Sequence, residues 1–249
     1  MLSAAWHPQS IARLVEEYEA ALPPDGWPNW VLGNHDKPRI ASRVGAAQGR
    51  IAAMLLLTLR GTPTIYYGDE IGMQNVEIPH DRLLDTVEKN VPGHGLGRDG
   101  CRTPMQWDAT PYAGFSENKP WLPLPGSAQH ENVENQRRDC TSFFSLYRHL
   151  IALRRSEPAL QLGAYKTIYA HEDVWLYLRE GGDERILVAL NMGSEPTTVA
   201  LTSGPIVGLL LLSTHLDRDG ELARGSVDLR SHEGVVVKLS TESVLAQQT

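Results

Sequence analysis

The sequence predicts an α/β protein in which parallel β/α units are followed by a small antiparallel β-sandwich. Helical and strand-like apolar patterns alternate at the start of the chain, polar residues follow each predicted strand, and short strand-like runs at regular spacing fill the end. Alternation with short connections is typical of parallel sheets, in which functional groups gather at the carboxyl ends of the strands. We expect a domain boundary near Leu162, between an α/β part, 1–162, and a β-sandwich, 163–249.

The first part of the chain reads as helix, strand, helix, strand. Apolar residues at helical spacing indicate a first helix that ends before two prolines: Ile11, Leu14, Val15, Tyr18 and Leu22. The run 30–32 then predicts a short buried strand, and 48–59, apolar nearly all round, predicts a helix that is packed on both sides. The stretch TPTIYYGDEIG, 62–72, predicts a second strand that finishes in acidic residues.

Residues 74–140 form a long segment rich in Gly, Pro, Asn and Asp. A loop of this length is uncommon in a compact domain unless it is functional or disordered. The phrase GRDGCRTPMQWD, 97–108, argues against disorder because it carries aromatic, sulphur-containing and arginine side chains. We expect a helix after this segment, ending at Pro158, and then strands at 174–180, 185–191, 197–201, 207–213 and 234–240.

Composition and charge exclude several classes of function. The formal net charge of -7 and the scattered Lys and Arg residues argue against nucleic acid or an anionic membrane as a partner. Cys101 and Cys140 stand in no metal-binding pattern, so we expect two free thiols and neither a zinc site nor a disulfide. The most apolar run, 51–59, is shorter than the ~20 residues that span a bilayer, and no signal peptide is visible. These observations predict a cytoplasmic protein.

Three polar side chains crowd the end of the first predicted strand: Asn34, His35 and Asp36. Taken alone, this run is equally compatible with an Asx turn, because Asn and Asp side chains commonly bond to their own backbone.

The second predicted strand ends in Asp69 and Glu70. These carboxylates are candidates for lining a site. We favour a structural role for them, as partners of Arg39 or Arg102 in an ion-pair network.

Three motifs in this order resemble a known enzyme family. VLGNHDKPR, 31–39, and GTPTIYYGDEIGM, 61–73, are similar to the seventh and eighth strands of the α-amylase superfamily, glycoside hydrolase family thirteen. RDGCRTPMQWD, 98–108, resembles the α-glucosidase, oligo-glucosidase and trehalulose or trehalose synthase group within it. The resemblance runs through the whole chain. It implies a partial (β/α)8 TIM barrel, consisting of the last two strands with their flanking helices, followed by the family's antiparallel β-sandwich.

The resemblance also implies roles for the residues after the first strand. Asp36 resembles the third carboxylate of the family, which stabilises the transition state by bonding to hydroxyls of the distorted sugar ring and helps keep the neighbouring acid protonated. His35 resembles the family's partner to a sugar hydroxyl. Asn34 is expected to orient the turn, and Arg39 resembles the arginine that reaches back toward the sugar.

The segment that contains RTPMQWD contributes a second group of candidates. We expect Arg102, Gln106, Trp107 and Asp108 to form the rim of a sugar site, where an aromatic face stacks on the ring and amides bind hydroxyls. A well-packed loop anchored by Trp107 explains the same residues equally well. No metal and no cofactor is expected.

The nucleophile and the general acid of the family lie on its fourth and fifth barrel strands, which precede everything in this sequence. The chain therefore resembles the C-terminal half of a retaining α-glucosidase for short α-glucosides or sucrose, with the N-terminal half of the barrel as its missing partner. We expect the chain alone to be inactive, because retaining hydrolysis needs both carboxylates. A trehalose synthase or other isomerase or transglucosylase is an alternative. A catalytically silent structural relative, of the kind that serves amino-acid transporters, is another.

Overall fold

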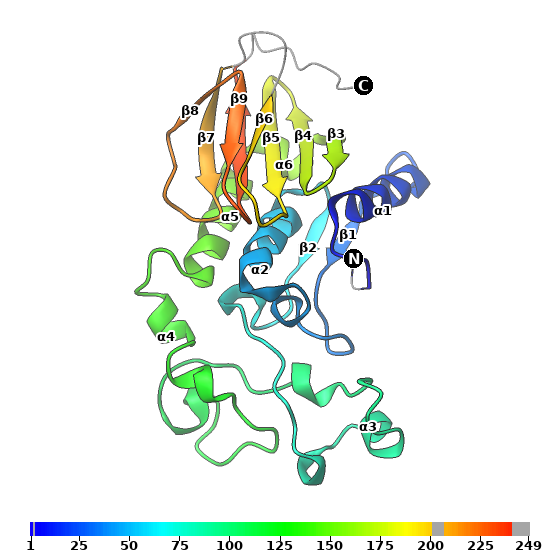
Figure 1. The fold of residues 1–249 in the computed structure, drawn as a ribbon, viewed down its shortest axis with the longest axis vertical. Coiled ribbons are helices and arrows are strands. Elements are labelled where there is room, and N and C mark those ends of the chain that lie inside the picture. Colours follow the sequence, from blue (N-terminus) through cyan, green and yellow to red (C-terminus); the bar gives the residue numbers. More distant parts are fainter. Residues whose placement is uncertain (2, 201–206, 241–249) are drawn as a thin grey trace.

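The computed structural model describes residues 1, 3–200 and 207–240 of the chain. Seen from the side, the long antiparallel sheet lies at one end, helix α2 crosses the middle, and the segment 74–140 occupies the opposite end (Figure 1). Within the described residues, no helix has the length and apolar character needed to cross a membrane.

Two short strands and two helices make up the start of the chain, in the expected order. They are α1 (Pro8–Ala21), β1 (Asn29–Val31), α2 (Ile40–Thr58) and β2 (Thr62–Thr64). The strands run parallel, with Trp30 opposite Pro63. Their carboxyl ends therefore lie at the same edge, where the chain continues into the 34–36 loop after β1 and into residues 65–72 after β2.

The second strand is much shorter than the stretch 62–72 that the apolar pattern predicted. After Thr64 the chain leaves the sheet, turns at Gly68 with a φ of 88°, and enters a 3₁₀-helix at Asp69–Ile71. A side chain at Gly68 would lie 2.8 Å from a guanidinium nitrogen of Arg39, so the turn needs glycine both for its φ and for space. The β-branched and aromatic residues that read as a strand instead bend around that arginine.

Helix α2 is the central element of the core. It begins at Ile40, earlier than the expected 48–59, and is interrupted at Gly45, whose φ of 80° is not helical. Every residue from Ile51 to Leu57 is buried, which agrees with the prediction of a helix packed on both sides.

The carboxyl end of α2 is closed by an arginine from another helix. Arg154 of α5 (Phe143–Ser156) donates hydrogen bonds to the carbonyl oxygens of Leu57, Leu59 and Gly61 at 2.8, 2.9 and 2.6 Å. Carbonyl groups in the last turn of a helix lack partners within it, and a cation there also interacts favourably with the helix dipole.

We expect Arg154→Ala to lower the free energy of unfolding by about 2 kcal/mol, since three carbonyls lose a charged donor. The matched control is Arg155→Ala in the same last turn, at an exposed position, where we expect a change within about 0.5 kcal/mol. Urea unfolding followed by circular dichroism measures both. Equal losses in the two variants would show that Arg154 does not hold the end of α2.

The segment 74–140 consists of irregular chain with short helical turns. Its elements are η2 (His80–Arg82), α3 (Thr86–Asn90), η3 (Asp99–Cys101), η4 (Pro111–Gly114), η5 (Gly126–Gln129) and α4 (Val133–Gln136). Helix α5 and a final turn, α6 (Pro158–Leu162), return the chain to the sheet end.

The rest of the described chain forms antiparallel sheets. Strands β3 (Ala164–His171), β4 (Val174–Gly181), β5 (Glu184–Asn191), β10 (Gly234–Leu239), β7 (Val207–Ser213) and β8 (Leu222–Arg224) pair in this order, and β6 (Thr197–Ala200) pairs with β9 (Ser226–Leu229). The five expected strands are present. Strands β3, β8 and β9 were not expected. The end of the expected strand at 201 lies outside the described residues.

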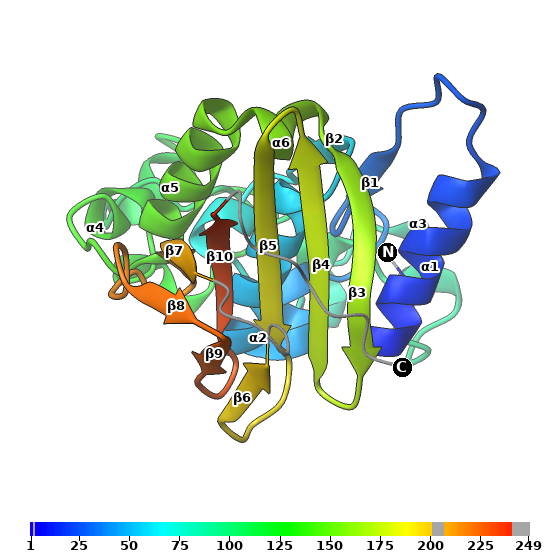
Figure 2. The same ribbon diagram turned by 90° about the horizontal axis from the view of Figure 1, so that it is seen from above.

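The middle strands of the six-stranded sheet, β4, β5 and β10, are buried on both faces, and helix α2 lies behind the sheet in Figure 2. Along β4, Trp175 and Tyr177 join the core around α2, whereas Leu176 and Leu178 pack with the two-stranded β6–β9 sheet. Burial on both faces explains why β4 and β5 are apolar without alternation. One hydrophobic cluster thus includes residues from both sides of Leu162.

Candidate active site

The first candidate residues lie in a tight loop that follows β1. The backbone N–H of Asp36 donates a hydrogen bond to Oδ1 of Asn34 at 2.9 Å, which is an Asx turn. Asn34 therefore orients this turn. The turn leaves the carboxylate of Asp36 44% exposed and the imidazole of His35 66% exposed.

Three cationic or hydrogen-bonding side chains surround the Asp36 carboxylate. Oδ1 accepts hydrogen bonds from Arg98 at 3.2 Å and from Arg102 at 3.1 Å, and Oδ2 lies 3.3 Å from Nε2 of His35. Arg102 also donates to the carbonyl oxygen of His35 at 2.7 Å. Arg102 thus contacts a carboxylate that lies 66 positions earlier in the sequence.

These contacts set the charge state of Asp36. Partial desolvation acts to raise its pKa, but the hydrogen bond from Arg98 and the charges of His35, Arg98 and Arg102 outweigh it and lower the pKa below the usual value. Asp36 is therefore an anion at neutral pH, held between two arginines.

Arg98 was missed as a candidate in the sequence, although the motif RDGCRTP contains it. It forms a two-pronged ion pair with Asp85, with N–O distances of 2.9 and 2.8 Å, and its own backbone N–H also donates to Asp85. The buried Asp85 has a pKa well below its usual value, chiefly because of the hydrogen bonds from the Arg98 side chain. The carboxylate of Asp99 accepts hydrogen bonds from the backbone N–H groups of Leu84 and Asp85. These bonds fix the backbone at Asp85, and with it the carboxylate that pairs with Arg98.

The position of Arg39 corrects an expectation. Its side chain is fully buried, donates to the carbonyl oxygen of Tyr67, and lies over the rings of Tyr66 and Tyr67 at 5.0 and 4.6 Å. It is not among the arginines that contact Asp36. The aromatic faces and the Tyr67 carbonyl hold this buried guanidinium, so it is not open to a ligand in this structure.

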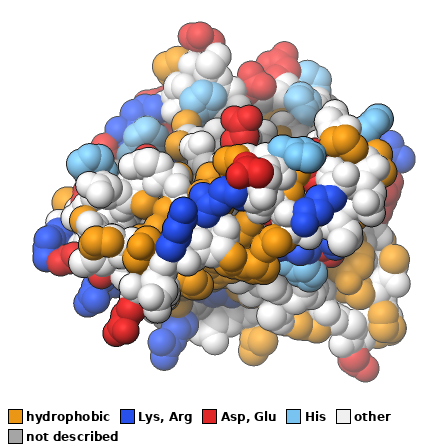
Figure 3. Space-filling view, turned by 90° about the horizontal axis from the view of Figure 1, so that it is seen from below, with side chains coloured by type: hydrophobic (Ala, Val, Ile, Leu, Met, Phe, Trp, Pro, Cys, Tyr) orange, Lys and Arg blue, Asp and Glu red, His pale blue; other side chains and the backbone are white. Residues whose placement is uncertain are grey.

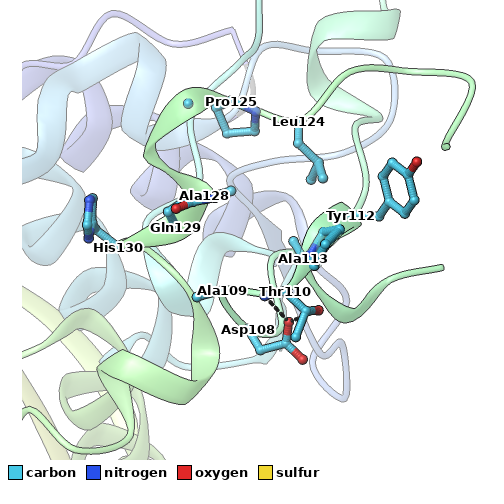
Figure 4. A pocket seen from close by; sticks show the side chains of 12 residues that line it. Asp108, Ala109, Thr110, Tyr112, Ala113, Leu124, Pro125, Ala128, Gln129 and His130 are labelled. Atoms are coloured by element: carbon cyan, nitrogen blue, oxygen red, sulfur yellow. Dashed lines mark hydrogen bonds between the residues drawn. The ribbon is translucent and has the colours of Figure 1, made fainter. Parts of the chain in front are cut away.

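Of the candidate residues in RTPMQWD, some are buried and others are exposed. Gln106 is only 2% exposed, which corrects the expectation that it binds sugar hydroxyls, because its side chain is packed inside the loop. Trp107 is 49% exposed, so its ring is open to a ligand. Asp108 accepts hydrogen bonds from the backbone and hydroxyl of Thr110 beside a separate cavity of about 390 Å³ (Figure 4). That cavity is lined by parts of the segment 108–130 and does not include Asp36.

Asp69 and Glu70 begin the 3₁₀-helix that follows β2. Asp69 is 3% exposed, and desolvation raises its pKa to about 7, although the charges of Arg39 and Arg43 act in the opposite direction. Its Oδ2 accepts a hydrogen bond from the backbone N–H of Tyr66 at 3.3 Å. Asp69 thus feels the charges of Arg39 and Arg43, and the expected ion-pair network of Asp69 and Glu70 with Arg39 or Arg102 stays a prediction.

The site belongs to the end of the molecule formed by the 74–140 segment. On the face seen from that end, basic, acidic and histidine side chains lie close together beside apolar ones (Figure 3). Among the described residues, no three His, Cys, Asp or Glu side chains are grouped so that they could hold a metal ion.

Comparison with known proteins identifies the family to which the chain belongs. The family model for the alpha-amylase catalytic domain matches residues 3–163. The chain is 34% identical over 224 residues to a probable alpha-glucosidase of Rhizobium meliloti (strain 1021), with 86% of this chain and 40% of the relative covered. It is 31% identical over 250 residues to the amino acid transporter heavy chain SLC3A1 of Homo sapiens, with 96% of this chain and 35% of the relative covered.

Solved structures agree with the sequence comparison. The trehalulose synthase MutB from Pseudomonas mesoacidophila MX-45 superimposes with a TM-score of 0.84 at 30% identity, covering 93% of this chain and 46% of that one. The chain thus spans less than half the length of these relatives. The predicted resemblance is confirmed: the chain belongs to the alpha-amylase family of glycoside hydrolases.

Proposed function

We propose that this chain supplies the C-terminal part of a retaining α-glucosidase that cleaves short α-glucosides. The observation that carries the proposal is the Asp36 carboxylate, held as an anion by Arg98, Arg102 and His35 at the carboxyl end of β1. A preorganised anion at this position suits an oxocarbenium-like transition state, in which positive charge develops on the sugar.

Each residue of this group has a role in the proposal. Asp36 stabilises the transition state through the ring hydroxyls, and its charge raises the pKa of an acid placed beside it. The exposed His35 donates to a further hydroxyl, and Arg102 holds the 34–36 loop through the carbonyl of His35. The half-exposed ring of Trp107 offers a stacking face at the rim.

In this proposal the nucleophile and the general acid come from the N-terminal half of the barrel, which residues 1–249 do not include. Residues 1–162 supply the last two strands of a (β/α)8 barrel, residues 163–249 form its C-terminal sheet domain, and an N-terminal half-barrel adds the first six strands. Among the described residues β1 pairs with β2 alone. A groove of about 600 Å³ beside that strand is lined by apolar and aromatic side chains, including Leu14, Tyr18 and Trp30. A strand added there would bury this surface and pair with the open edge.

The likeness to a trehalulose synthase supports a second candidate, a glucosyl isomerase. Isomerase and hydrolase share the carboxylates and differ in whether water reaches the glycosyl intermediate, so their products separate them. The likeness to a transporter heavy chain makes a silent structural role a third candidate. The charged group around Asp36 favours an enzyme over that role, because its carboxylate is 44% exposed and therefore accessible to a ligand.

We expect the chain alone to release no p-nitrophenol from p-nitrophenyl α-glucoside, since Asp36 without a nucleophile and an acid does not carry out a double displacement. The measurement is absorbance with the purified 249-residue chain, and Asp36→Ala serves as the background control. Release that disappears in Asp36→Ala would contradict this expectation.

The proposed function itself is tested by restoring the missing strands. The chain is co-expressed with the N-terminal half of a related α-glucosidase, the complex is isolated, and sucrose and maltose are supplied. Free glucose supports the hydrolase, and a rearranged disaccharide supports the isomerase. A stable complex that leaves both sugars intact would overturn the enzymatic assignment in favour of the structural one.

A further inference from the structure

The two tyrosines that follow β2 contact the backbone on either side of Arg102. The hydroxyl of Tyr66 donates to the carbonyl oxygen of Cys101 at 3.1 Å, and the hydroxyl of Tyr67 donates to the carbonyl oxygen of Thr103 at 2.7 Å. Arg102 is the residue between these two carbonyls. Its guanidinium is the group that bonds to both the backbone of His35 and the carboxylate of Asp36.

The same two rings also contact the segment that carries Asp36. Arg39, three residues after Asp36, places its guanidinium over both rings and donates to the carbonyl oxygen of Tyr67. The rings also pack edge to face against each other, with centroids 4.7 Å apart. Buried cation–π contacts of this kind are stronger than exposed ones, because the cation has lost its water.

These contacts form a closed chain of interactions. Arg39, three residues after Asp36, packs on the tyrosine rings, and the tyrosine hydroxyls bond to the carbonyls of Cys101 and Thr103. Arg102, between those two carbonyls, bonds to Asp36. The 34–39 loop and the 98–103 segment are otherwise far apart in the sequence. These contacts therefore fix the distance between the Asp36 carboxylate and Arg102, one of the two arginines that contact it.

We propose that Tyr66 and Tyr67 are positioning residues that hold Arg102 against Asp36. The inference rests on the proposed function only in naming this group a carbohydrate site. The tyrosines themselves act through the Cys101 and Thr103 carbonyls, and their rings lie on Arg39 and not on the Asp36 carboxylate.

The test is the pKa of Asp36, measured by carbon-detected NMR on the full 249-residue chain. In the double variant Tyr66→Phe/Tyr67→Phe both rings remain over Arg39 and only the two hydroxyls are lost. We expect the pKa of Asp36 to rise toward its usual value and the amides of 101–103 to exchange at least about fivefold faster, the factor that corresponds to one hydrogen bond of about 1 kcal/mol. Arg102→Gln removes the guanidinium itself and gives, for comparison, the largest rise in the pKa of Asp36 that loss of Arg102 can cause.

Tyr18→Phe is the matched control, because this ring packs on Trp30 and its hydroxyl makes no hydrogen bond among the described residues. It should leave the pKa of Asp36 unchanged. If the double variant is poorly folded by circular dichroism, Tyr67→Phe alone is measured, since it removes the shorter of the two bonds. An unchanged pKa in the folded tyrosine variants would overturn the proposal, whether or not Arg102→Gln shifts it. No substrate enters this measurement, so a lack of glucosidase activity in the complex with the N-terminal half-barrel would overturn the proposed function and leave the positioning role standing.

Discussion

In the enzyme assembled from this chain and an N-terminal half-barrel, Asp36→Ala is expected to lower kcat about a thousandfold, equivalent to about 4 kcal/mol of transition-state stabilisation. The carboxylate is held as an anion before substrate arrives, so it stabilises developing positive charge without reorganisation. KM should change much less, because the interaction strengthens mainly in the transition state. Steady-state kinetics with p-nitrophenyl α-glucoside measures both parameters.

Two further variants sharpen this expectation. Asp36→Asn keeps the size of the side chain and its hydrogen-bonding capacity but removes the charge, so a loss close to that of alanine assigns the effect to charge. Asp183→Ala, at an exposed position in the turn between β4 and β5, is the control and should leave kcat unchanged. Near-normal turnover in Asp36→Ala would refute the role of this residue.

The stability of the chain should depend on pH through Asp69, with an amplitude of about 4 kcal/mol. Burial raises the pKa of this carboxyl to about 7 in the folded chain, whereas an unfolded aspartate titrates near 3.9. Between these values the folded state binds the proton and the unfolded state does not. The contribution of Asp69 to the free energy of unfolding is therefore greatest below about pH 4, falls by about 1.4 kcal/mol per pH unit as pH rises, and levels off above pH 7.

Asp69→Asn removes this titration and should gain stability relative to the parent chain as pH increases. Urea unfolding between pH 5 and pH 8 gives the difference at each pH, and the exposed Asp25→Asn is the matched control. Arg39, Arg43 and Glu70 are the charged groups around Asp69, and they are the same in all three proteins. Parallel curves for Asp69→Asn and the parent would show that Asp69 is ionised in the folded chain throughout this range.

Much of the architecture was predictable because it depends on local patterns. The spacing of apolar residues in α1 and α5, and the continuous apolar run of α2, identify helices whatever they pack against. Strand β2 was predicted too long, because β-branched and aromatic residues read as strand even where they wrap an arginine. Strand β3 was missed because its sequence, AYKTIYAH, has no continuous apolar run, and its residues are half-buried or exposed.

For the candidate site, the sequence by itself determined the family motifs and the loop that carries His35 and Asp36, and it left open whether Asn34 makes an Asx turn, which the structure shows. These features rest on residues within a few positions of each other. Only the tertiary structure decided which arginines contact the carboxylate of Asp36. Arg98 and Arg102 reach it across more than sixty residues, whereas Arg39, three positions away, is buried under Tyr66 and Tyr67. The physical reason is that a guanidinium needs a partner or an aromatic face wherever it is desolvated, and which one it finds depends on how distant segments pack, not on the order of residues along the chain.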